Sequence, residues 1–173
     1  MNEVLTCLKE RRSIRKYKNE QIKDEELNQI LEAGTYAATG MGMQSPIMVV
    51  VQDAETISAL SKMNAAVMGA ASDPFYGAPT VIIVLADRSR PTYVQDGSLV
   101  MGNLMNAAYS IGVDSCWIHR AKEVFELEEY QNLLSELGVN GEYEGIGHCV
   151  VGYIDEDYPT APKRKENRVF FAE

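Results

Sequence analysis

The chain has 173 residues, of which 46% are hydrophobic and 24% are charged. This balance is typical of one globular domain and excludes collagen-like and disordered chains. With 16 Lys and Arg against 25 Asp and Glu, the formal net charge is −9, which excludes a general nucleic-acid binder because such a protein needs a basic surface.

The first part of the chain is predicted to form two helices and a strand. Apolar spacing favours a helix over 3–10 and another over 25–37, with Asp24 as the N-cap of the second. The segment 39–46 (TGMGMQSP) cannot continue that helix because two glycines and a proline interrupt it. The apolar run 47–52 then predicts a buried strand.

The middle of the chain is predicted to hold the centre of the core. A helix is expected over 54–64, followed by a loop or lid over 65–78. The β-branched run 80–86 (TVIIVLA) predicts a strand that is buried on both faces, so helices must cover its sheet. A long helix is expected over 94–111, and its Gly, Ala and Ser residues make it slim enough for a central or interface position.

The last part is predicted to complete the sheet and leave a tail. A strand over 113–118, a helix over 126–137 that ends at Gly138, and a core strand over 145–154 are expected. From Asp155 onward the chain is polar and rich in proline and charge. Because this tail has no core of its own, we expect it to lie across another surface, such as a second subunit.

Cysteine and histidine usage argues against a disulfide framework and a metal site. Cys7, Cys116 and Cys149 are odd in number and form no CxxC pair, and the two histidines, His119 and His148, form no HxxxH pattern. The sequence has neither an apolar run near ~20 residues nor a recognisable signal peptide. We therefore expect no metal, no membrane span and a cytoplasmic location.

Basic residues gather at two places, 11–18 and 163–168. These segments hold nine of the 16 Lys and Arg residues and one acid, a local charge of +8, whereas the rest of the chain sums to −17. Arg supplies a planar set of donors that matches phosphate, and in an extended segment Arg11, Ser13 and Arg15 share one side. The alternative is a solvated run of charge. Two islands in an acidic chain favour a local anion site.

Two further motifs have a structural and a functional interpretation. The segment 40–45 (GMGMQS) nearly matches a dinucleotide-binding fingerprint, but a predicted helix precedes it and a strand follows, which is the reverse of the required order. Its glycines indicate either a tight turn or a backbone that approaches a flat ligand. Cys116 and His119 lack a third orienting group, so we interpret them as structural rather than as a nucleophile and base.

Six segments of the chain stand in a characteristic order. They are RRSIRKY (11–17), TGMGMQSP (39–46), FYGAPTVIIV (75–84), DGSLVMGNLMNAAYSIGVDSCWI (96–118), VVGYIDED (150–157) and APKRKENRV (161–169). In this order and spacing they resemble the FMN-dependent nitroreductase family over nearly the whole chain. The resemblance implies an α+β fold, with a central, mainly antiparallel sheet of about four to five strands flanked by helices, in an intertwined homodimer.

The resemblance also implies an activity. It places an FMN-binding domain at 1–155 and, at 156–173, a C-terminal arm that contacts the phosphate and wraps the partner subunit. It implies an oxidoreductase that uses NADH or NADPH to reduce nitroaromatics, quinones or related small-molecule acceptors in a ping-pong cycle. No catalytic side chain is implied, because FMN carries the chemistry. The alternatives are a flavin-binding redox module without efficient turnover, and an interaction protein whose basic islands bind an acidic partner.

The resemblance assigns the cofactor contacts to groups of residues. The phosphate and ribityl chain fall to Arg11, Arg12, Ser13 and Arg15, together with Lys163, Arg164 and Lys165, so both islands are expected to converge on one anion. A loop of the partner subunit meets the ring through Thr39, Gly40, Met41, Gly42 and Gln44. The ring also lies beside Cys116, Trp117, Ile118, His119 and Arg120, with a backbone N–H directed at N5. The pyrimidine edge meets Asn64.

Two departures from the family pattern bear on the site. Gly42 stands where many relatives have Asn, which removes a side-chain contact to the ring. His119 and Arg120 stand where many relatives have Gly. A basic pair at this place either favours an anionic second substrate or the reduced flavin anion, or it points to solvent. The short segment 65–78 leaves little lid.

Overall fold

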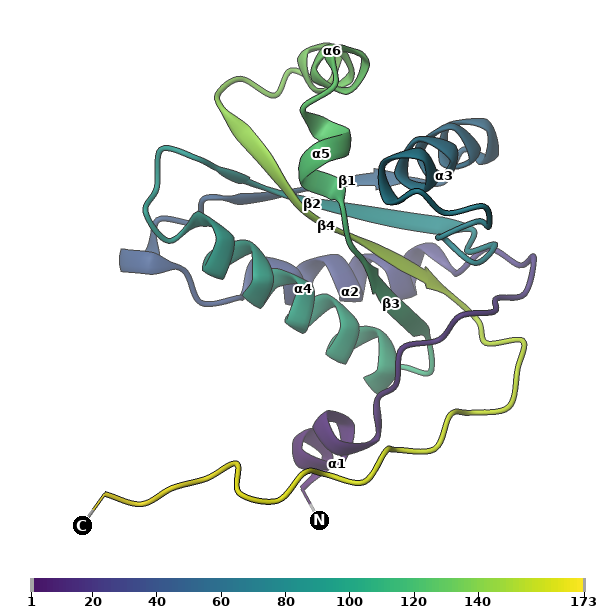
Figure 1. Cartoon of the computed structure of the whole chain (residues 1–173), viewed down its shortest axis with the longest axis vertical. Coiled ribbons are helices and arrows are strands. Elements are labelled where there is room, and N and C mark those ends of the chain that lie inside the picture. Colours follow the sequence, from purple (N-terminus) through teal and green to yellow (C-terminus); the bar gives the residue numbers. More distant parts are fainter. Residues whose placement is uncertain (1, 173) are drawn as a thin grey trace.

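A computed structural model describes residues 2–172 of the chain. Its centre is a four-stranded sheet (Figure 1). The strands are β1 (Pro46–Val51), β2 (Thr80–Asp87), β3 (Asp114–Ile118) and β4 (Tyr143–Gly152). Their order in the sheet is β1-β2-β4-β3, and every neighbouring pair is antiparallel. The predicted α+β class and antiparallel sheet are confirmed.

Helices cover both faces of this sheet. They are α1 (Glu3–Glu10), α2 (Asp24–Thr35), α3 (Ala54–Met68), α4 (Tyr93–Ser110), α5 (Ala121–Phe125) and α6 (Glu128–Glu136). In Figure 1, α3, α5 and α6 lie above the sheet and α2 and α4 lie below it. A short 3₁₀ turn, η1 (Gly40–Gly42), separates α2 from β1.

The strand β2 lies at the centre of two apolar cores. Val81 and Ile83 face the core under α3 and α5, whereas Ile82 and Val84 face the core over α2 and α4. All four side chains are fully buried, and each stabilises the fold by about 1.5–3 kcal/mol relative to an exposed position. The prediction of a strand buried on both faces is confirmed.

The helix α4 is the longest of the described elements, and one of its sides is only partly covered by residues 2–172. Val100 and Leu104 are buried against α2 and the sheet, but Leu99 is 50% exposed. The neighbouring α1 has no buried residue at all, and Leu8 is 56% exposed. These helices therefore carry an apolar surface that a single chain leaves open to water.

Several element boundaries differ from those predicted. Asp24 is the first helical residue rather than the N-cap, because the Lys23 N–H donates to the Glu26 carboxylate at 2.9 Å and makes Lys23 the cap. α3 continues to Met68, past the expected end at residue 64. β1 is a half-buried edge strand rather than a fully buried one, because only β2 pairs with it.

The helix α5 is an element that the sequence did not predict. It has only five residues, and its N-cap, Arg120, has a left-handed backbone (φ 77°) instead of a Ser, Thr or Asp cap. Ala121, Val124 and Phe125 anchor it against the sheet. Tertiary packing therefore specifies this turn of helix more than its local sequence does.

Candidate functional site

The basic segment after α1 runs in an extended path beside β3. Ser13 forms a parallel bridge with Ser115, and the N–H of Ile14 donates to the Ser115 carbonyl at 3.1 Å. The Ile14 side chain is fully buried, which fixes the path of the segment. Because side chains alternate along an extended chain, Ser13 and Arg15 share the side opposite Ile14, as predicted for an extended segment. Arg11, the third residue of that prediction, is the C-cap of α1 at the start of the segment.

The C-terminal arm binds the backbone of this basic segment. The N–H of Arg12 donates to the Tyr158 hydroxyl at 3.1 Å, and the N–H of Arg15 donates to the Glu156 carboxylate at 2.9 Å. Further along, the backbone of Tyr17 pairs with that of Ile154 in an antiparallel bridge. The arm therefore fixes the basic segment without occupying the guanidinium groups of Arg12 and Arg15.

Two guanidinium donors of the segment are buried without a partner among residues 2–172. They are Nη1 of Arg11 and Nε of Arg12. Arg12 is held in place because its Nη1 donates to the carbonyl groups of Lys9 and Arg11, at 2.8 and 2.6 Å. An unpaired buried donor costs about 1–3 kcal/mol, so this set fits an anion with several acceptor oxygens, as a phosphate has.

The C-terminal basic residues lie on the exposed arm. The guanidinium group of Arg164 donates to the carbonyl of Pro162 through Nε and Nη2, at 3.1 and 2.8 Å. Within the described residues, no hydrogen bond or ion pair joins Lys163, Arg164 or Lys165 to the arginines near the N-terminus. Convergence of both islands on one anion stays a prediction.

The end of β3 presents backbone rather than reactive side chains. Cys116 and Ile118 point into the core and are 3% and 5% exposed, and Trp117 lies against Gly147 on the other face. Burial raises the pKa of the Cys116 thiol, which argues against a nucleophilic thiolate near neutral pH. Because β3 is an edge strand, the backbone groups on its outer side that follow the bridge between Ser13 and Ser115 pair with no other strand of the sheet.

His119 and Arg120 follow β3 at the surface. The Arg120 guanidinium makes an ion pair with Glu123 in the first turn of α5, with 2.7 Å between Nη1 and Oε1. His119 is exposed. In the single chain this basic pair points toward solvent, and its place beside the flavin stays a prediction.

The loop 39–44 is a tight turn with its own hydrogen bonds. The Thr39 carbonyl accepts the Gly42 N–H at 3.0 Å, and the Thr39 hydroxyl accepts the Gln44 N–H, also at 3.0 Å. Met41, Gly42 and Gln44 have left-handed φ values of 53°, 66° and 50°. Since Met41 at the tip is 90% exposed, the turn also offers its backbone and this side chain to a ligand outside the chain.

Asn64 is an inward-facing residue of α3. It is fully buried, and its Nδ2 donates to the Met68 sulfur at 3.2 Å, whereas its Oδ1 has no partner in the described part of the chain. The structure therefore leaves an unpaired acceptor at the position predicted to meet the pyrimidine edge. It does not bring Asn64 into contact with the basic segment.

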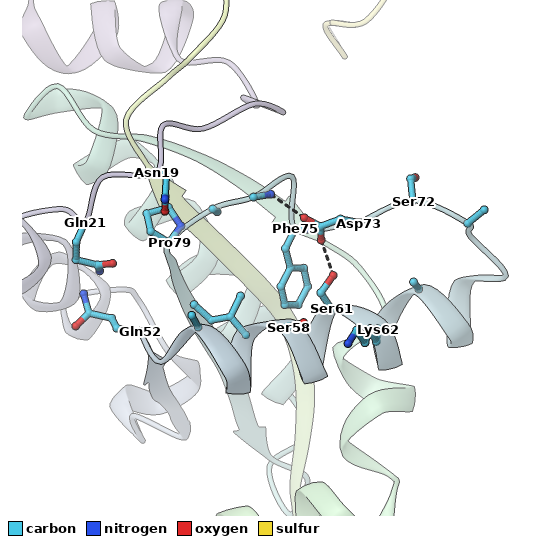
Figure 2. A pocket seen from close by; sticks show the side chains of 16 residues that line it. Asn19, Gln21, Gln52, Ser58, Ser61, Lys62, Ser72, Asp73, Phe75 and Pro79 are labelled. Atoms are coloured by element: carbon cyan, nitrogen blue, oxygen red, sulfur yellow. Dashed lines mark hydrogen bonds between the residues drawn. The ribbon is translucent and has the colours of Figure 1, made fainter.

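A separate pocket of about 550 Å³ lies between α3 and the segment that follows it (Figure 2). Three carboxamides line one side: Asn19, Gln21 and Gln52. Opposite them, the Asp73 carboxylate accepts hydrogen bonds from the Ser61 hydroxyl and, at 2.8 Å, from the Phe75 N–H. No residue predicted to bind the cofactor lines this pocket, so it is not the predicted site.

The glycine loop and the basic segment lie at opposite ends of α4. The Gly40 N–H donates to Asp96 near the start of the helix, whereas Tyr109 near its end donates to Glu10, just before the basic segment. The stretch of helix from Asp96 to Tyr109 is about 20 Å long. The structure thus brings the basic segment beside β3 but leaves the loop on the far side (Figure 1).

Residues 2–172 hold neither a metal cluster nor a membrane-spanning helix. No group of three or more His, Cys, Asp or Glu side chains stands close enough to hold a metal ion. No helix in this range combines the length and the apolar character needed to cross a bilayer. His148, the second histidine, is fully buried beside Phe75, and its ring nitrogens have no hydrogen-bond partner there.

Comparison with known proteins agrees with this geometry. The family model described as "Nitroreductase family" matches residues 8–156. The fold is similar to a nitroreductase from Bacteroides fragilis whose crystal structure contains FMN, with a TM-score of 0.89 and 29% identity over 100% of both chains.

Two curated sequences are also similar. A protein of Archaeoglobus fulgidus, named provisionally as an NADH dehydrogenase/NAD(P)H nitroreductase, is 34% identical over 142 residues, which cover 79% of this chain and 76% of that protein. An NAD(P)H-dependent FMN reductase of Bacillus subtilis is 34% identical over 91 residues, 52% of this chain and 34% of that protein.

Proposed function

The chain belongs to the nitroreductase family, and from this premise we propose that it is an FMN-dependent oxidoreductase that uses NAD(P)H to reduce nitroaromatics, quinones or related acceptors. The pair of buried, unpaired guanidinium donors on Arg11 and Arg12 carries the proposal, because it fits the phosphate of FMN. The FMN-bound relative from Bacteroides fragilis supports the same cofactor.

The residues of this chain hold and orient the cofactor. Arg11, Arg12 and Ser13 bind the phosphate, and Arg15 adds positive charge at the surface. At the other end, the open backbone edge after Ile118 orients the ring through N–H groups. When bound, FMN supplies the redox chemistry by taking a hydride from NAD(P)H and passing reducing equivalents to the acceptor in a ping-pong cycle. The protein's contribution is positioning, so no acid–base pair is required.

We propose that the site is completed in a homodimer. The apolar surface of α1 and α4 supports this, as does a groove of about 890 Å³ between these helices, lined by Val4, Leu8 and Ala107 among others. A second copy covers this surface and supplies its loop 39–44, which one chain holds far from its own basic segment.

The arm 156–173 is proposed to wrap the partner subunit. Phe170 and Phe171 near its end are 82% and 87% exposed in a single chain, and a neighbouring subunit offers them cover. We also propose a cytoplasmic location, which the three free cysteines support, because thiols stay reduced there.

The visible spectrum of the purified protein during anaerobic titration with NADH and NADPH tests the function. We expect a yellow protein whose flavin absorbance bleaches on reduction and returns when a quinone is added. A colourless protein that takes up no added FMN contradicts the proposal. Bleaching without sustained NAD(P)H oxidation in the presence of acceptor identifies a redox module instead.

A further inference from the structure

Asp96 is a buried carboxylate that none of the predicted contacts includes. It lies in the first turn of α4 and is 3% exposed. Its Oδ1 accepts the Gly40 N–H at 3.0 Å, and its Oδ2 accepts the hydroxyl groups of Ser45 and Thr92, at 3.3 and 3.1 Å. One side chain therefore ties both ends of the glycine loop to the start of the helix.

The loop held in this way is strained. Left-handed backbone costs a residue with a side chain about 1–2 kcal/mol, and Met41 and Gln44 both adopt it. Such conformations persist only where the surrounding structure enforces them. Gly40 is part of that constraint, because Thr92 leaves no room for a side chain at this position.

Among the described residues, one further hydrogen bond joins the loop to the sheet, because the Ser45 carbonyl accepts the Asp87 N–H at 3.4 Å. A cavity of about 120 Å³ lies beneath it, lined by Thr39 and Gln44 above and by Met48 and Val100 of the core. The side chains from Met41 to Gln44 are exposed, so they bury little apolar surface. Asp96 therefore accepts two of the hydrogen bonds that join the loop to the body of the fold, one at each end of the loop, and the Asp87 N–H supplies another.

We propose that Asp96 is a positioning residue that presets the loop 39–45 for the FMN bound on the partner subunit. This inference rests on the proposed function, and it assigns to a buried acid the task of holding the loop in its cofactor-binding shape before the cofactor arrives. A preset loop loses less conformational freedom on binding, so the affinity for FMN is higher.

The chemistry of the three donors selects the test variants. Asp96→Ala removes every acceptor. Asp96→Asn keeps the volume and leaves one oxygen for the Gly40 N–H, and its NH₂ can donate to the hydroxyl groups of Ser45 and Thr92, which accept as well as donate. Asp53→Ala is the control, because Asp53 also accepts hydrogen bonds at the start of a helix. It is the N-cap of α3, accepts the N–H and the hydroxyl of Thr56, and lies outside the proposed site.

Hydrogen–deuterium exchange of the protein without FMN gives the first readout. We expect Asp96→Ala to speed exchange of the Gly40 amide by about tenfold or more, Asp96→Asn by less than about threefold, and Asp53→Ala not at all. The second readout is FMN affinity from flavin fluorescence. There we expect Asp96→Ala to raise the Kd for FMN about tenfold and Asp96→Asn to restore most of the lost affinity. Light scattering measures the oligomeric state of the parent protein.

The outcomes separate this inference from the proposed function. Unchanged Gly40 exchange in Asp96→Ala overturns the inference, and so does faster exchange with an unchanged Kd for FMN. If Asp96→Ala does not fold, Ser45→Ala replaces it, since it removes one of the three bonds and is expected to show a smaller effect in the same direction in both readouts. A parent protein that binds no FMN contradicts the proposed function itself, whatever the exchange rates are.

Discussion

The hydroxyl group of Tyr158 accepts the backbone N–H of Arg12 at 3.1 Å, which joins the C-terminal arm to the segment that begins the proposed phosphate site. The Tyr158 ring also lies beside that of Tyr109 at the end of α4, with 6.0 Å between the ring centroids. The arm is thus connected to both elements that place the arginines.

Replacing this tyrosine tests whether the arm supports the site. Tyr158→Phe keeps the ring contact and removes the acceptor for the Arg12 N–H. We expect a stability loss of about 0.5–1 kcal/mol, because the freed N–H is near the surface, and a weaker affinity for FMN. Thermal unfolding and flavin fluorescence measure the two effects. Tyr36→Phe, at an 80% exposed position, is the control, and equal effects of both variants would contradict the role of the arm.

The arginines are expected to recognise the phosphate and not the ring. Arg11→Ala removes a buried charged donor, so the Kd for FMN should rise about tenfold or more, because hydrogen bonds to charged groups contribute about 1.5–3 kcal/mol. Riboflavin lacks the phosphate, so its Kd should change by less than about twofold. Arg88→Ala removes an arginine that pairs with Glu144 at the start of β4 and is the control. An equal loss for riboflavin and FMN argues against phosphate recognition.

The exposed face of α1 is expected to lie in a subunit interface. Leu8→Asp places a charge on this face, so the protein should become monomeric and lose FMN, because each site needs both chains. Leu137→Asp is the matched control, since Leu137 is equally exposed, at 55%, but follows α6 at the other end of the molecule. Light scattering with absorbance at the flavin band checks both. A parent protein that is monomeric at micromolar concentration contradicts the interface.

Burial of His148 predicts how stability depends on pH. Desolvation lowers the pKa of His148 from 6.5 to about 3, so between these values the unfolded chain binds a proton that the folded chain does not. Stability should therefore fall as pH drops below 6.5, by at most about 1.4 kcal/mol per pH unit from this group, and be unaffected by it above 6.5.

The variant His148→Phe, which suits the neighbouring rings of Phe75 and Phe125, should flatten this decline between pH 6.5 and 5. His119→Phe changes an exposed histidine and should leave the decline as it is in the parent. Urea unfolding at several pH values measures the slopes, and parallel slopes for the parent and His148→Phe would show that the buried histidine is not the cause.

Periodicity and composition predicted the elements that bury large apolar surfaces. The run 80–86 and the helix 94–111 were placed to within a residue or so, because β2 and α4 carry continuous patterns of core residues. α5 was missed because its five residues are too few for a periodic signal. The N-cap of α2 was predicted one residue too late, because the Glu26 carboxylate accepts the Lys23 N–H and makes Lys23 the cap.

The site could be predicted in part. The segment around Ser13 was predicted as an anion site because charge stands out in an acidic chain, and that role stays a prediction. Its extended path, which burial of Ile14 fixes, was only assumed. Asp96 was missed because an acid in the first turn of a helix usually interacts with the helix dipole at the surface, and the sequence has no signal that this one is buried. The separation of the loop from the arginines depends on which ends of α4 they contact, through Gly40 with Asp96 and Glu10 with Tyr109, and no pattern in the sequence indicates these pairs.

The placement of these groups at opposite ends of α4 has a genetic consequence. If every site combines the arginines of one chain with the loop of the other, a chain altered at Arg11 and a chain altered at Asp96 are defective alone but complement each other when mixed. In a mixed dimer, one site receives both defects and the other receives neither. Random exchange of equal amounts then makes about a quarter of all sites fully native in composition.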